Sequence, residues 1–240
     1  MWAIEELISI SAIAYTRVLI KDRTMDERRL PVYFLIDVSA SMDGEPILTV
    51  GTIIQRLLAD LRADPCALET AWISVITFGD NTKQVVPLTP LDEFRIPKFT
   101  IGGGAAFGPA LSLLCECREF EVVKATAERK GDWRPIVFTF VNGSKPVGDI
   151  DKGIHDFMSH KWWSYVFIAV GQNADIVTLR RISRDRIISI ESVGPETLQK
   201  YFQWVVGSES SMRTCSNHVV VRNMNDAELE DFPPIPEGLL

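Results

Sequence analysis

The sequence predicts an α/β fold: a doubly wound, mostly parallel sheet of about six strands with one antiparallel edge strand and helices on both faces. Three observations predict it. Short apolar runs, rich in β-branched and aromatic residues, alternate with longer helical patterns, as is typical of parallel strands buried on both faces. One pair of runs is joined by a short polar turn and indicates a hairpin. The composition, 46% hydrophobic and 24% charged, is sufficient for a full core.

Turn residues and helical patterns bound each predicted strand. The hairpin joins residues 71–78 to residues 83–88 through Gly79-Asp80-Asn81-Thr82. Pro46 suits the first turn of the next helical pattern, and Asp64-Pro65 ends that pattern. The other predicted strands cover residues 32–36, 136–141, 164–170 and 186–190, and the predicted helices cover residues 47–61, 107–123, 151–160, 174–182 and 195–206.

The chain divides into one domain and two flanking segments. Apolar residues at near-helical spacing predict an amphipathic helix in an N-terminal extension, residues 1–24. The domain covers residues 25–206. Residues 207–240 turn polar, then acidic, and contain several prolines, so we expect a tail there rather than core.

Composition excludes several classes of function. The net charge is −7 and no block of basic residues stands out, which makes nucleic acid a poor partner. No membrane span is expected, because charged residues interrupt the apolar stretch near the N-terminus. The four cysteines form no CxxC pair and the three histidines have no zinc spacing, so we expect free thiols and structural or exposed imidazoles. Together with the lack of a secretory signal, this favours a cytoplasmic protein.

The candidate site begins where the first strand ends. Asp37, Ser39 and Ser41 follow the apolar run 32–36 at alternate positions, at the edge of an open α/β sheet where ligands bind. One carboxylate with two hydroxyls suits a hard cation such as Mg²⁺. The same residues also suit ordinary turn chemistry, since Asp and Ser hydrogen-bond to nearby backbone groups and cap helices. Spacing alone leaves both interpretations open.

Several short segments, together with this motif and the element order, resemble the von Willebrand factor A (vWA) family. The likeness extends to the TerY-like vWA proteins associated with tellurite resistance in bacteria, and it covers the chain from about Met25 to the tail. The segments are Arg29-Leu30-Pro31-Val32-Tyr33, Ser39-Ala40-Ser41-Met42, Gly44-Glu45-Pro46-Ile47, Leu68-Glu69-Thr70-Ala71, Ser74-Val75-Ile76-Thr77-Phe78, Val86-Pro87-Leu88-Thr89, Val123-Lys124, Lys130-Gly131-Asp132-Trp133 and Thr197-Leu198-Gln199-Lys200-Tyr201-Phe202.

The resemblance implies a metal-ion-dependent adhesion site, a surface Mg²⁺ that a partner's carboxylate completes. Asp37, Ser39 and Ser41 match its first three positions. The fourth is normally Thr and the fifth normally Asp, and this chain has Ala105 and Asn142 there. Only one formal negative charge is left, so we expect a weakened cation site, because ligand charge offsets the dehydration of a divalent ion.

The resemblance also implies a non-enzymatic protein-binding module of a tellurite-resistance or stress-response system, with kinase- or phosphatase-type proteins as partners. The expected contact residues on the loops around the site are Asp43, Glu45, Gly104, Phe107, Asn142 and Lys145. Two alternatives stay open. One is a metal-free scaffold that binds through other faces. The other is a metal-dependent hydrolase, which the lack of a histidine near these loops and of a Gly-x-Ser-x-Gly elbow disfavours.

Overall fold

The computed structural model describes residues 28–128, 130–142, 149–162, 164–170, 176–183 and 187–189. The predicted N-terminal extension, the predicted helix at residues 195–206 and the predicted tail lie outside the described residues.

The described strands form one sheet with the order β3-β2-β1-β4-β5-β6. Every neighbouring pair is parallel except β2 and β3, so the predicted doubly wound, mostly parallel sheet with one antiparallel strand is confirmed. The chain adds β2 on one side of β1 and later adds β4 on the other side, which makes the gap between β1 and β4 the switch point of the topology. The strands are β1 Leu30–Asp37, β2 Ala71–Phe78, β3 Thr82–Pro90, β4 Ile136–Val141, β5 Ser164–Ala169 and β6 Ile187–Ser189.

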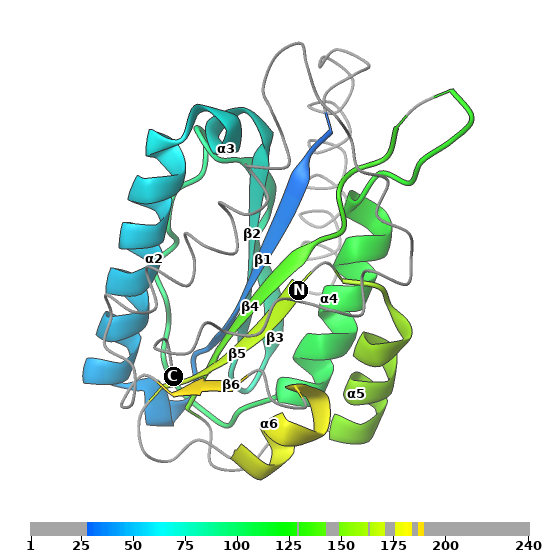
Figure 1. Ribbon diagram of the computed structural model, residues 1–240. Coiled ribbons are helices and arrows are strands. Elements are labelled where there is room, and N and C mark those ends of the chain that lie inside the picture. The colour runs from blue at the N-terminus through cyan, green and yellow to red at the C-terminus, as the bar shows by residue number, and fades with distance from the viewer. Residues whose placement is uncertain are drawn as a thin grey trace, which may run out of the picture.

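Helices cover both faces of the sheet (Figure 1). Helix α2 packs on one face, where its apolar stripe meets residues such as Phe34 and Phe138. Helices α4, α5 and α6 pack on the other face, against residues such as Tyr33 and Phe167. All eight residues of β1 are buried, because this central strand is covered from both sides. The helices are η1 Ala40–Met42, α2 Glu45–Ala63, α3 Pro65–Thr70, α4 Phe107–Glu121, α5 Ile150–Ser159 and α6 Ile176–Ser183.

One predicted helix end is confirmed and one is wrong. Helix α2 ends at Ala63, directly before Asp64-Pro65, as predicted. Pro65 also begins the short helix α3, which was not predicted, since proline suits a first helical position. Helix α4 ends at Glu121 and does not continue through Val123. The backbone at Val122 is extended, and the amide of Val123 donates to the carboxylate of Asp132 at 2.8 Å.

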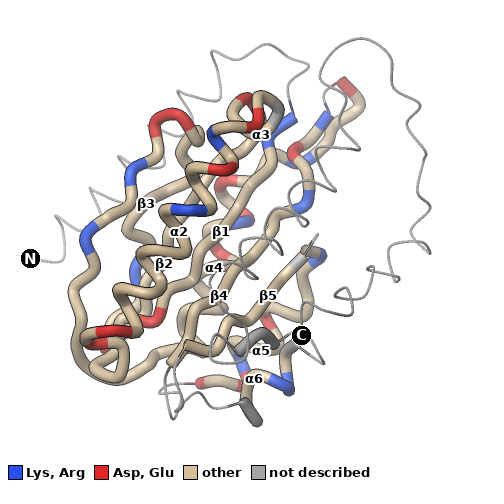
Figure 2. The backbone as a smooth tube through the Cα atoms, turned by 60° about the vertical axis from the view of Figure 1, so that its left-hand side comes forward, with Lys and Arg blue, Asp and Glu red and all other residues tan. Residues whose placement is uncertain are grey.

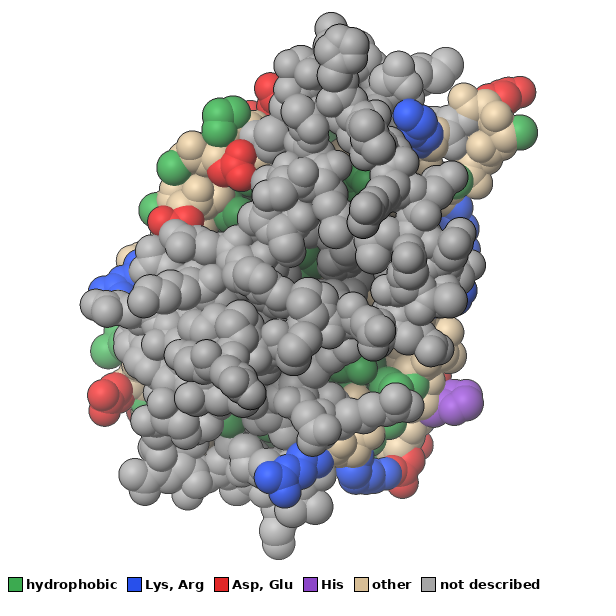
Figure 3. All heavy atoms as spheres, in the orientation of Figure 1, with side chains coloured by type: hydrophobic (Ala, Val, Ile, Leu, Met, Phe, Trp, Pro, Cys, Tyr) green, Lys and Arg blue, Asp and Glu red, His purple; other side chains and the backbone are tan. Residues whose placement is uncertain are grey.

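An ion pair at the surface links α5 and α6. It joins Arg181 of α6 to Asp151 of α5. Figure 3 shows basic and acidic side chains together at this lower margin of the molecule.

None of the described helices is both long and apolar enough to cross a membrane.

Two glycines bring α4 and α5 into backbone contact. A Cβ atom at Gly153 would lie 2.3 Å from the carbonyl oxygen of Gly108, and one at Gly108 would lie 2.3 Å from that of Asp149. These distances are far below van der Waals contact, so only glycine allows the two helices to approach this closely.

A buried polar network closes the opposite end of the sheet from the candidate site. The guanidinium of Arg29 forms an ion pair with Asp132, and its Nη2 donates to the carbonyl of Glu121 at 2.7 Å. The carboxylate of Glu121 accepts from the hydroxyl of Tyr33 and from the amide of Leu88, each at 3.0 Å. Burial raises the pKa of the Glu121 carboxyl, despite hydrogen bonds that oppose the shift.

Candidate functional site

The candidate site lies at the switch point, on the edge where the parallel strands end. We call this the carboxyl edge, and its described loops, residues 38–45, 79–81, 102–106 and 142, the carboxyl-edge loops. Asp37 is the last residue of β1, and Asn142 directly follows β4. Because β1 and β4 are neighbours, the sheet itself places these two residues side by side.

Asp37 ties two strand ends together. Its side chain is fully buried, and Oδ1 accepts from the amide of Ser39 at 2.8 Å. Oδ2 accepts from the amide of Asn142 at 3.1 Å. A buried carboxylate is costly unless it is hydrogen-bonded, and these two bonds offset part of that cost. Asp37 therefore serves the local turn and also places a negative charge at the switch point.

Ser39, Ser41 and Asn142 gather around this carboxylate. The two serine hydroxyl oxygens lie 3.0 Å apart. The side-chain Nδ2 of Asn142 donates to the carbonyl oxygen of Ser41 at 2.6 Å, which connects the loop after β4 to the loop after β1. The opposite amide orientation would place two oxygens against each other at that short distance, so the hydrogen bond assigns the amide.

The side-chain oxygen of Asn142, Oδ1, is buried. Asn142 is 4% exposed, and its Oδ1 has no hydrogen-bond partner among the described residues. A buried unpaired acceptor costs about 1–3 kcal/mol, which a hydrogen-bond donor or a cation at the site would recover.

A glycine-rich loop packs against the loop after β1 through backbone hydrogen bonds. The amide of Gly102 donates to the carbonyl of Val38 at 2.9 Å, and the carbonyl of Gly103 accepts from the amide of Ala40 at 3.0 Å. Gly103 has a φ of +76°, and a Cβ atom there would lie 1.9 Å from Cγ of Asp80. Asp80 also accepts from the amide of Gly104 at 2.8 Å, so this exposed carboxylate holds the loop in place.

Sequence reasoning missed the role of Asp80. It assigned this residue to the turn of the hairpin, and nothing in the local sequence reveals a contact across more than twenty positions. The signal that could have located it is the element order, because the turn after β2 must reach the same edge as the glycine-rich loop.

The candidate metal ligands at this site fit a divalent cation only in part. Asp37, Ser39, Ser41 and Asn142 offer one carboxylate, two hydroxyls and one amide oxygen, all of the hard type that Mg²⁺ prefers. Ala105, at the position that the vWA resemblance assigns to a ligand, is 5% exposed and has only a methyl group. No group of three or more His, Cys, Asp or Glu side chains that could hold a metal occurs among the described residues. The single formal charge is the main shortfall.

The predicted partner-contact residues differ in their exposure to solvent. Asp43 and Glu45 are exposed beside the serine loop, and Gly104 is half-buried. Phe107 is a correction: it is 2% exposed and its ring packs against Phe78, with centroids 5.5 Å apart, so it belongs to the core and does not face a partner. Lys145 lies outside the described residues.

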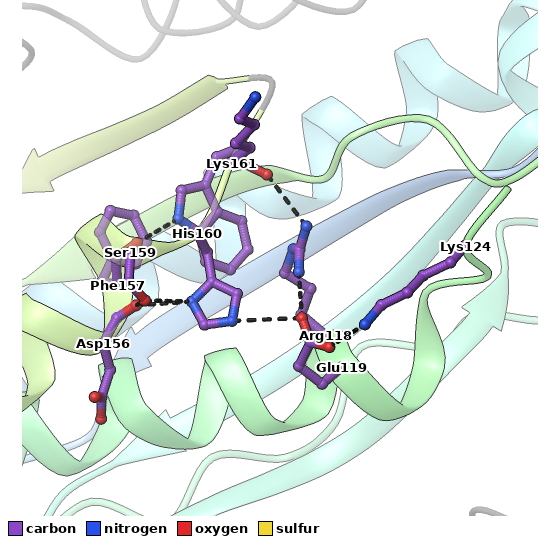
Figure 4. Close-up of polar contacts among 9 residues, drawn as sticks. Arg118, Glu119, Lys124, Asp156, Phe157, Ser159, His160 and Lys161 are labelled. Atoms are coloured by element: carbon purple, nitrogen blue, oxygen red, sulfur yellow. Dashed lines mark hydrogen bonds and ion pairs between the residues drawn. The ribbon is translucent and has the colours of Figure 1, made fainter.

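The described histidines lie away from the site, at the C-terminal half of α5. His160 donates from Nδ1 to the carbonyl of Asp156 at 2.7 Å, and its Nε2 lies 3.4 Å from a carboxylate oxygen of Glu119 (Figure 4). A hydrogen bond from Lys124 lowers the pKa of the Glu119 carboxyl. His155 is exposed on the same helix. The expectation of structural or exposed imidazoles therefore holds for these two.

Two of the cysteines are buried free thiols, as the sequence predicts. Both lie in α4, and burial raises the pKa of Cys115 to about 12 and that of Cys117 further still. Neither thiol is a nucleophile near neutral pH.

Solved structures share this architecture at low sequence identity. Proximal thread matrix protein 1 from the mussel byssus superimposes with a TM-score of 0.55 at 18% identity, covering 75% of this chain and 48% of that one. The same mussel protein with zinc in its metal-ion-dependent adhesion site gives 0.53 at 18% identity, with the same coverage. The ArnB paralog VWA2 from Sulfolobus acidocaldarius gives 0.52 at 16% identity, covering 73% of this chain and 45% of that one. This chain therefore spans about half the length of these structures.

Sequence comparison assigns the family. No curated protein matches the chain. The family model described as the von Willebrand factor type A domain matches residues 32–199, from the first strand through most of the domain. The chain therefore belongs to the von Willebrand factor type A domain family.

Proposed function

We propose that this protein is a non-enzymatic protein–protein interaction module that binds its partner through the carboxyl-edge loops. The observation that carries the proposal is the construction of the site. Hydrogen bonds join the loop after β1 to the glycine-rich loop and to Asn142, and Oδ1 of Asn142 is buried without a partner among the described residues. Membership of the vWA family supports it. Binding residues on loops held by a rigid sheet are a common arrangement for recognition.

A divalent cation at this site would be held by the oxygens of Asp37, Ser39, Ser41 and Asn142. When bound, it would supply positive charge to which a partner's carboxylate could bind. The zinc-loaded adhesion site of the mussel protein supports a cation at this position of the fold. With one negative charge among the ligands, we expect Mg²⁺ to bind with a dissociation constant weaker than roughly 10 mM.

The geometry gives little to support a hydrolase. Ser39 and Ser41 hydrogen-bond to each other, and no histidine occurs in the carboxyl-edge loops. A serine nucleophile needs an adjacent base that a third group orients, and the described loops contain none.

We further propose, from the resemblance of the sequence to TerY-like proteins, a cytoplasmic role in a bacterial tellurite-resistance or stress-response system. Kinase- or phosphatase-type proteins of the same system would then be the partners. A metal-free scaffold that binds through other faces is the competing proposal, and the loss of ligand chemistry at Ala105 favours it over a fully functional adhesion site.

The partner surface is tested by matched charge reversals at the two ends of the sheet. We expect Asp43→Arg/Glu45→Arg to abolish capture of the partners that wild-type protein retains. Asp92→Arg/Glu93→Arg changes the charge equally, with exposed residues in the loop after β3, at the opposite end, and is expected to retain the partners. Retention by both variants would favour the scaffold over the loop surface.

The cation site is tested by calorimetric titration of Mg²⁺ and Mn²⁺. We expect weak binding by wild type, a further loss in Asp37→Asn, and at least about a tenfold gain in Ala105→Thr/Asn142→Asp, which restores a hydroxyl and a second carboxylate. Asp37→Asn is preferred to Asp37→Ala because it keeps an oxygen that can accept from a backbone amide. Tight wild-type binding would contradict the reduced site.

A further inference from the structure

The ionisable residues of the described carboxyl-edge loops are all acidic. Their exposed ionisable residues are Asp43, Glu45 and Asp80, in addition to the buried Asp37, and these described loops contain no Lys or Arg. Acidic positions, in red, are visible at this end of the molecule in Figure 2. Without a strongly held divalent cation, a partner's carboxylate would meet net repulsion here, because like charges across an interface disfavour association.

The site offers hydrogen-bond acceptors rather than donors. Oδ1 of Asn142 is buried and unpaired in the described structure, and Nδ2 of the same amide is fixed on the carbonyl of Ser41. The hydroxyl oxygens of Ser39 and Ser41 and the carboxylate of Asp37 complete a set of oxygens around one formal negative charge. A ligand that satisfies this set must bring hydrogen-bond donors and positive charge.

A single positive charge matches this set better than two. Mg²⁺ loses its hydration reluctantly, and one carboxylate offsets little of that cost. A primary ammonium group has one charge and three N–H donors, which suits one carboxylate, one amide oxygen and one hydroxyl.

We propose that the site binds the ammonium group of a lysine side chain from a partner protein, at the position where relatives with a complete adhesion site hold a metal ion. The exchange of Asp for Asn at position 142 and of Thr for Ala at position 105 converts a site for a divalent ion and an acidic partner into one for a basic partner. The exposed Asp43, Glu45 and Asp80 form an acidic rim that attracts the same partner. This inference rests on the proposed protein-binding function of the loops.

The test uses n-butylammonium chloride as a probe for the lysine side chain, added to the ¹⁵N-labelled full chain. We expect saturable shifts of the Ser39 and Gly104 amides and of the Asn142 side-chain amide, with a dissociation constant of roughly 1–10 mM. Tetramethylammonium has the same charge but no N–H donor, and we expect it to bind at least about tenfold more weakly. MgCl₂ at matched ionic strength is expected to compete poorly.

Variants sharpen the test. Ser39→Ala/Ser41→Ala is expected to weaken butylammonium binding severalfold, whereas Asp92→Arg/Glu93→Arg, with exposed residues at the other end of the sheet, is expected to leave it unchanged. Asn142→Asp adds a carboxylate and is expected to shift the preference toward Mg²⁺. Equal shifts with tetramethylammonium would overturn the proposal, as would tighter binding of Mg²⁺ by wild type.

The same experiment separates this inference from the proposed function. Loss of partners in Asp43→Arg/Glu45→Arg without any butylammonium site would overturn the lysine assignment and leave the loop surface standing. A saturable butylammonium site with partners fully retained by that variant would support the ammonium site and overturn the loop surface as the place where partners bind.

Discussion

Gly103 is the position at which the site tolerates a side chain least. Its φ is +76°, and a methyl group would collide with the Asp80 carboxylate. We expect Gly103→Ala to destabilise the protein by about 1–3 kcal/mol and to free Asp80 from the amide of Gly104. Urea unfolding measures the effect. Gly102→Ala is the matched control, because a Cβ atom there meets nothing within 4 Å. Equal losses in both variants would refute the collision.

At the scale of single residues, the sequence predicts which residues lie at the site better than it predicts the contacts they make. Asp37, Ser39 and Ser41 were located by their position after the first strand, where ligands bind in open α/β sheets, and Asn142 by the resemblance to the vWA family; the structure places all four at one edge. Phe107 was misassigned because its position in a loop-to-helix junction suggested exposure, whereas the ring faces the sheet. The bond from Asn142 to Ser41 depends on how closely two loops approach, which no local pattern contains.

Helices α4 and α5 depend on two glycines for their close contact. A Cβ atom at Gly153 would meet backbone atoms of Gly108, which cannot rotate away. We expect Gly153→Ala to force the helices apart and to cost about 1–3 kcal/mol, as overpacking typically does. Gly51→Ala in α2 has open space around it and is expected to stabilise the protein by roughly 0.5–1 kcal/mol, since alanine favours helix. Thermal unfolding of both variants distinguishes the two effects, and a neutral Gly153→Ala would contradict the helix contact.

Element boundaries were predictable where burial on both faces leaves an unbroken apolar run. The ranges 71–78 and 136–141 coincide with β2 and β4 for this reason. Prediction was incomplete where one residue has two uses. Asp64-Pro65 was interpreted correctly as the end of a helix, but Pro65 also begins α3. The predicted end of α4 was two residues too late, and there the amide of Val123 donates to a distant side chain, Asp132.

The stability of the whole molecule should depend on pH through Glu121. A carboxyl whose pKa is raised in the folded state contributes stability that is fully present below its unfolded pKa of about 4.3 and is lost as the pH rises through the raised value. The substitution Glu121→Gln would keep an oxygen that can accept from Leu88 and Gln84 and would remove the titration. We expect the advantage of wild type over Glu121→Gln to shrink above about pH 4.3, by at most ~1.4 kcal/mol per pH unit.

Urea unfolding of both proteins from pH 4 to pH 8 provides the measurement. The comparison isolates Glu121, because other carboxyls, such as Asp156 with its pKa lowered by Lys152, titrate equally in both proteins. A difference in unfolding free energy that stays constant with pH would show that Glu121 titrates alike in the folded and unfolded chains.

The antiparallel strand β3 also affects how molecules meet at high concentration. Among the described strands it forms one border of the sheet, and an open border can recruit a strand from another copy. Pro87 lies within this strand and has no N–H to donate, Pro90 ends it, and the pairing with β2 shifts register near Val75. A chain without this interrupted border would present a continuous template for ordered aggregation, so the hairpin that sets the topology also protects the protein's colloidal stability.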